Sequence, residues 1–129
     1  MKPPKPTTYY LILILLLALL LRTYHLDQRE YSTDEKWTIR YSTELLTGEF
    51  YHNINQYTFP PLYYYLFALF LLIGNHAVLL FRLFLVLFSI LGIYLTYHLT
   101  KRLLSENTAI LTSFLLSISL FHLVYSHHM

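Results

Sequence analysis

Three long apolar stretches, separated by polar segments, dominate the hydrophobic pattern of the chain. The first covers residues 7–26, and about 20 residues at 1.5 Å rise span the ~30 Å hydrocarbon core of a bilayer. The other two cover residues 77–100 and 108–126. A fourth apolar block, residues 59–74, has a core of only about 14 residues, which is typical of a juxtamembrane or re-entrant helix. The pattern predicts an all-α membrane protein with three transmembrane helices.

The polar segment between residues 27 and 58 contains the signals of one further helix. Ser32-Thr33-Asp34-Glu35 fits a capping box, with Ser32 as N-cap and Glu35 at the third helical position. Apolar or aromatic residues then recur every four positions, and Gly48 is a suitable stop: the recurring residues are Trp37, Tyr41 and Leu45. We predict an amphipathic helix over about residues 33–47 that lies on the membrane surface.

The basic residues orient the predicted spans. Residues 1–6 form a basic, Pro-rich tail, and Lys101-Arg102 occupies the predicted turn between the last two spans. The positive-inside rule places both segments, and so the N-terminus, in the cytoplasm. The loop 27–58 and both ends of 59–74 are then external. In a competing layout residues 59–74 form a true fourth span, which would put Lys101-Arg102 outside.

The composition supports a membrane location and gives no sign of a nucleic-acid partner. Hydrophobic residues make up 56% of the 129 residues and charged residues 12%, whereas soluble domains carry about 25% charged residues. The net charge is +2 without any basic block, so nothing indicates a nucleic-acid partner. The chain has no Cys, which rules out disulfide bonds.

The favoured topology gathers polar residues from distant parts of the chain at one membrane face. Asp34 and Glu35 open the predicted surface helix; they either complement its dipole or, as stabilised carboxylates, act as a general base. Arg82 lies about five residues into a span. It either snorkels to the interface or binds phosphate through its planar fork of donors.

Four further residues at this face are candidates for substrate or phosphate binding. Pro60 and Pro61 open the short apolar block, and His127 and His128 end the last span. Two adjacent histidines do not share a helix face, so their spacing is poor for a metal site. The alternative is that these histidines are ordinary polar residues at the interface.

The order of several short motifs resembles the N-terminal portion of the GT-C glycosyltransferases of the protein O-mannosyltransferase (glycosyltransferase family 39) and aminoarabinose-transferase (ArnT-like) type. The motifs are, in order, Leu21-Arg22-Thr23-Tyr24-His25-Leu26-Asp27, Asp34-Glu35, Leu46-Thr47-Gly48, Pro60-Pro61-Leu62-Tyr63-Tyr64, Leu80-Phe81-Arg82-Leu83, Tyr97-His98-Leu99-Thr100-Lys101-Arg102-Leu103 and Phe121-His122-Leu123-Val124-Tyr125-Ser126. The resemblance covers the chain from about residue 10 onward.

The resemblance implies a site and a reaction. It assigns the acceptor-activating base to Asp34, with Glu35 beside it, and places Pro60-Pro61 near the active site and Arg82 at the outer end of its span. The donor would be a sugar on a polyprenyl phosphate, transferred with inversion at the external face. Membrane lipid and this donor are the expected partners. No redox cofactor is needed, and a divalent metal held by the acids is left open.

The resemblance also implies a plasma or ER-type membrane, and a chain that is the N-terminal piece of a longer transferase, because such enzymes run to several hundred residues. The alternative function is a small non-catalytic integral membrane protein, or a degenerate remnant of an enzyme. In that case Asp34, Glu35 and Arg82 would only set the topology.

Overall fold

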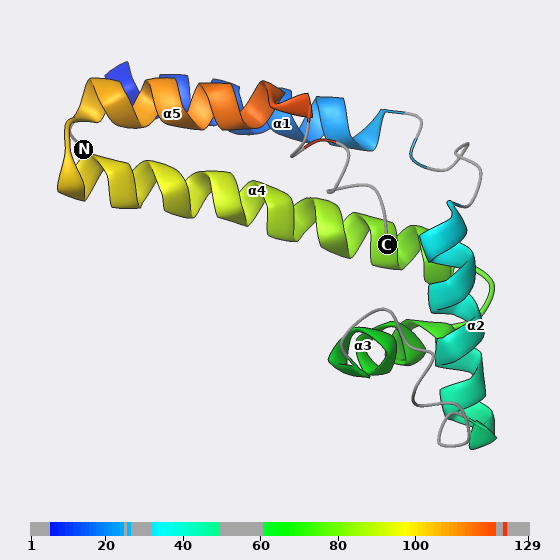
Figure 1. Cartoon of the computed structure of the whole chain (residues 1–129). Coiled ribbons are helices and arrows are strands. Elements are labelled where there is room, and N and C mark those ends of the chain that lie inside the picture. Colours follow the sequence, from blue (N-terminus) through cyan, green and yellow to red (C-terminus); the bar gives the residue numbers. More distant parts are fainter. Residues whose placement is uncertain (1–5, 25, 27–31, 50–60, 121–122, 124–129) are drawn as a thin grey trace, which may run out of the picture. The chain divides into compact units, whose positions relative to one another are not determined.

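The computed structural model describes residues 6–24, 26, 32–49, 61–120 and 123, and its regular elements in these ranges are helices. The prediction of an all-α fold of membrane type is confirmed. The helices are α1 (Pro6–Thr23), α2 (Thr33–Thr47), α3 (Pro61–Leu71), α4 (Ala77–Leu103) and α5 (Glu106–Ile118). They form two compact units (Figure 1), each described separately below.

The three-helix unit consists of α1, α4 from Phe84 onward, and α5. In it α1 and α5 run in the same direction and α4 runs in the opposite one (Figure 1). Small residues allow the helices to approach closely, because Ala18 of α1 and Ala109 of α5 are fully buried. Their neighbours in the two core clusters are larger, and include Ile93 and Tyr97 of α4.

Arg22 joins all three helices of this unit. Its side chain is fully buried, and its Nε donates a hydrogen bond of 2.8 Å to the Ser89 Oγ on α4. Its Nη1 donates to the carbonyl oxygens of Ala18 on α1 and Ser117 on α5, each at 3.1 Å. The Ser117 carbonyl belongs to the last turn of α5, where carbonyls have no partner within the helix. Arg22 therefore satisfies a helix end that would otherwise be costly to bury.

Removing the Ser89 hydroxyl should measurably weaken this unit. We expect Ser89→Ala to lower the free energy of unfolding in detergent by roughly 0.6–1.7 kcal/mol, the range measured for polar contacts between membrane helices. Thr96→Ala is the matched control, because among the described residues the Thr96 hydroxyl bonds to the Gly92 carbonyl within its own helix, at 2.8 Å, and not to another helix. Equal losses in both variants would contradict the role of Ser89 as a contact between helices.

The second unit, here the α2–α3 unit, consists of α2, α3 and the start of α4 up to Leu83. Tyr41 of α2 and Tyr64 of α3 form a buried cluster, with their rings 5.4 Å apart edge to face. The Ser42 hydroxyl donates to the Tyr64 carbonyl at 3.1 Å, which ties α2 to α3. Phe81 of α4 lies against Phe67 of α3, with ring centroids 4.9 Å apart. Aromatic packing thus holds the three helical segments of this unit together.

The turn between α4 and α5 differs from its prediction. Lys101 and Arg102 lie in the last turn of α4, which continues to Leu103. The helix extends because no breaker precedes Ser105, and because both cations complement the negative end of its dipole. Ser105 is the N-cap of α5, and its hydroxyl accepts a hydrogen bond of 3.2 Å from the Thr108 amide.

Among the described helices, α4 is the one whose length and hydropathy suit a membrane span. Ala77–Leu103 is long and apolar enough to cross a bilayer, with a mean hydropathy of 2.5 in its most apolar window. Residues 7–23 and 62–71 form shorter apolar helices. In the described part of the predicted span 108–126, α5 ends at Ile118 and Ser119 leaves the helical backbone with ψ 120°. The predicted orientation and number of spans stay predictions.

Candidate functional site

The first turn of α2 contains the capping box that the sequence predicted. Ser32 has extended backbone angles and its hydroxyl accepts a hydrogen bond of 3.1 Å from the Glu35 amide. In return, Glu35 Oε2 accepts one of 2.9 Å from the Ser32 amide. These reciprocal bonds fix the first turn and hold Asp34 between their two ends.

Glu35 also forms a buried ion pair with Arg82 of α4. The Arg82 Nε donates to Glu35 Oε1 at 2.7 Å, and its Nη2 donates to Oε2 at 2.8 Å. The Glu35 side chain is only 1% exposed and that of Arg82 4%. This fork-to-fork geometry is the strongest arrangement open to an arginine and a carboxylate. It joins residues that lie 47 positions apart in the chain.

Aromatic side chains of α3 and α4 lie beside this pair. Tyr63 of α3 contacts Phe81, the residue before Arg82, with ring centroids 5.6 Å apart. Burial raises the pKa of the Tyr63 phenol, and the negative charges of Glu35 and Asp34 raise that pKa further. The phenol therefore stays protonated and keeps its hydrogen-bond donor close to the two acids.

Asp34 differs from Glu35 in its surroundings. It is exposed, and among the described residues no hydrogen bond or ion pair occupies its carboxylate. Both oxygens of Glu35, by contrast, already accept bonds from Arg82 and one accepts from Ser32. Of the two acids, Asp34 is thus the one with a carboxylate open to an incoming group.

The structure brings together three of the residues that the sequence singled out, namely Asp34, Glu35 and Arg82. Sequence reasoning considered Arg82 as a phosphate ligand or a snorkelling residue, and did not foresee its pairing with Glu35. It also gave no role to Arg22 and did not place Tyr63 beside the acids. The available signal was that Arg22 and Arg82 stand in apolar helices, where a charged side chain needs a polar partner.

The remaining candidates cannot be placed with the site. Pro60, His127 and His128 lie outside the described residues, and of Pro61 only the backbone, which begins α3, is described. Within the described ranges, no group of three or more His, Cys, Asp or Glu gathers in a way that could hold a metal ion.

Fold and site together define a helical protein of membrane type with an acid–arginine site at the start of its longest apolar helix. Residues 58–129 match the model of the family described as dolichyl-phosphate-mannose-protein mannosyltransferase. This match covers more than half of the 129 residues, and the chain belongs to this family of glycosyltransferases. No curated protein and no solved structure matches it.

The residues that match the family contain one partner of the ion pair but not the other. Arg82 lies inside the matched residues, while Asp34 and Glu35 lie before them. The two bonds between Glu35 and Arg82 therefore connect the first turn of α2 to the region by which the family is identified.

Proposed function

We propose that the chain takes part in transferring a sugar from a polyprenyl-phosphate donor to an acceptor hydroxyl at the external membrane face. Mannose is the first sugar to test, because the family is named for mannosyl transfer from dolichyl phosphate. The observation that carries the proposal is the buried Glu35–Arg82 pair. It fixes an exposed carboxylate, Asp34, beside the start of an apolar helix along which a lipid-linked donor would lie.

In the proposed reaction the acceptor oxygen attacks the anomeric carbon, and the bond from that carbon to the phosphate oxygen breaks. Asp34 accepts the acceptor's proton as general base. Polyprenyl phosphate leaves with the bonding electron pair, and a cation is needed where its negative charge develops. Arg82 supplies this positive charge and Glu35 fixes its orientation. Direct displacement inverts the anomeric configuration.

The other predicted contacts stay part of the proposal. Pro60, Pro61, His127 and His128 are proposed to line the substrate site, as the predicted topology places them at the same face. The proposal needs no redox cofactor, and repeating the transfer assay below with EDTA tests whether a divalent metal assists. The site is assigned to the external side of a plasma or ER-type membrane, with the N-terminus in the cytoplasm.

A transfer assay in membranes tests this function. Membranes with and without the expressed protein receive radiolabelled mannosyl-phosphoryl polyprenol, and labelled sugar is measured in the protein fraction and as free sugar. Release of polyprenyl phosphate together with an α-linked product from a β-linked donor would support inverting transfer. If equal amounts of donor survive with and without the protein, the alternative of a non-catalytic membrane protein replaces the proposal.

A further inference from the structure

The C-terminal end of α4 carries two adjacent cations with different surroundings. Lys101 donates a hydrogen bond to the Glu106 carboxylate across the turn, and its Nζ lies 5.6 Å from the centre of the Tyr97 ring. Arg102 is exposed and lies about 100° further around the helix. In the part of the chain that the structure describes, no carboxylate pairs with Arg102.

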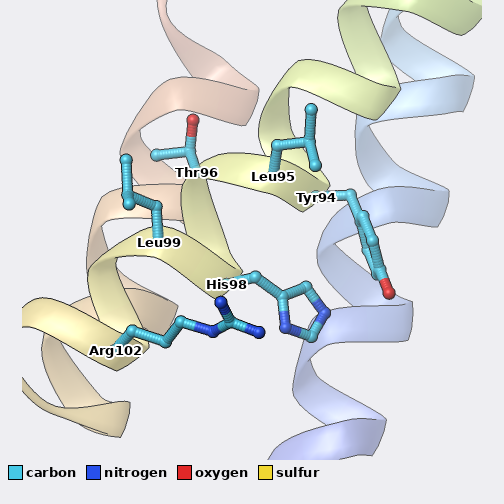
Figure 2. Close-up of a pocket in the computed structure, with 6 residues that line it drawn as sticks. All are labelled: Tyr94, Leu95, Thr96, His98, Leu99 and Arg102. Carbon is cyan, nitrogen blue, oxygen red and sulfur yellow. The ribbon is translucent and has the colours of Figure 1, made fainter.

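Arg102 stands at one end of a hollow along α4 with a volume of about 680 Å³. Figure 2 shows its guanidinium group extending toward the imidazole of His98, while Leu95 lies away from both groups. The residues that line the hollow are Tyr94, Leu95, Thr96, His98, Leu99 and Arg102. From residue 94 to residue 102 the helix rises about 12 Å, at 1.5 Å per residue.

Aromatic contacts hold His98 at the polar end of this hollow. The centre of its ring is 4.4 Å from that of Tyr94 and 5.3 Å from that of Tyr97, both edge to face. A neutral imidazole keeps one N–H donor in addition to its acceptor nitrogen. The polar end of the hollow therefore offers the donors of Arg102 and one donor of His98.

The remainder of the hollow is apolar and open. Leu95 is 56% exposed and Leu99 59% exposed, so both present hydrocarbon on the outer surface of a helix long enough to cross a bilayer. A cation at the end of such a helix lies at headgroup depth, where basic residues attract anionic lipids. A free phosphate would leave this apolar part uncovered, whereas a lipid covers both parts.

We propose that this hollow binds one anionic phospholipid, with its phosphate on Arg102 and His98 and an acyl chain along Leu95 and Leu99. A second copy of the helix carries no carboxylate between Ala77 and Leu103 that could meet Arg102, whereas a lipid offers its phosphate. The site lies in the three-helix unit, whereas the acid–arginine site lies in the α2–α3 unit. The proposal does not rest on sugar transfer.

Native mass spectrometry of the full chain in detergent tests the proposal. Phosphatidylglycerol and phosphatidylcholine with identical acyl chains are titrated, and the bound fractions are compared. We expect the wild type to bind phosphatidylglycerol more tightly. Arg102→Gln should weaken this binding about fivefold, which is the contribution of one basic residue near a membrane surface. Lys101→Gln removes the same charge one residue away and should change it less than twofold.

Two further arms test the apolar part and the identity of the occupant. Leu99→Trp leaves the charge unchanged but fills the hollow, and should weaken phosphatidylglycerol binding as strongly as Arg102→Gln. Millimolar glycerol 3-phosphate should not displace the lipid, because it lacks the acyl chain. Equal losses in Lys101→Gln and Arg102→Gln, displacement by glycerol 3-phosphate, or lipid-free dimers in place of lipid-bound monomers would each overturn the proposal.

Discussion

Asp34→Asn is expected to lower the rate of sugar transfer at least about a hundredfold, because general-base catalysis contributes roughly 10²–10⁴. Asparagine has nearly the same shape but cannot accept the proton of the acceptor hydroxyl. The exposed position of Asp34 means that the substitution leaves the packing of α2 intact. The measurement is the initial transfer rate in membranes at matched protein levels, with donor concentration varied. The loss should fall on kcat rather than on the KM for the donor.

Glu44→Gln is the control for Asp34→Asn. Glu44 lies on the same helix and accepts a 2.8 Å bond from Arg40, whose side chain is 60% exposed. Removing its charge should change the transfer rate less than twofold. If Asp34→Asn transfers as well as Glu44→Gln does, Asp34 only complements the dipole of α2. The assignment of the base would then be wrong even if the wild-type protein transfers sugar.

The local structure of α2 could be predicted from the sequence because its signals are local. A hydroxyl at Ser32 and a carboxylate three residues later satisfy each other's amides wherever the chain lies. Gly48 ends the helix with a φ of 83°, a conformation that costs little only without a Cβ. Both features depend on neighbours within a few positions, so no knowledge of the tertiary fold was needed.

The partner of Arg82 could not be predicted in this way. Local rules suggested that Arg82 snorkels to a nearby interface and that Glu35 complements the dipole of its own helix. The structure instead pairs them across 47 positions, because α3 and the start of α4 pack against the buried face of α2. Arg22 shows the same limit. Its position near the end of an apolar stretch suggests exposure, yet it is fully buried among three helices.

Breaking the Glu35–Arg82 pair should have the largest effect on stability. Removing one partner of a buried ion pair leaves the other charge without compensation, which costs about 3–5 kcal/mol. We expect this loss for Glu35→Gln and for Arg82→Met, measured as the free energy of unfolding in detergent. Glutamine is chosen at position 35 because it still accepts the bond from the Ser32 amide, so the capping box survives.

The double variant Glu35→Gln/Arg82→Met separates the pair from its surroundings. With both charges removed, no uncompensated charge remains, so the double variant should be more stable than the sum of the single losses predicts, by more than about 1 kcal/mol. Glu44→Gln again serves as control and should cost under about 1 kcal/mol, because its partner Arg40 is 60% exposed and solvent screens their pair, although the Glu44 side chain itself is 14% exposed. Additive losses at Glu35 and Arg82 would show that the two side chains are not coupled. Glu35 would then not orient Arg82, and transfer activity should survive Glu35→Gln.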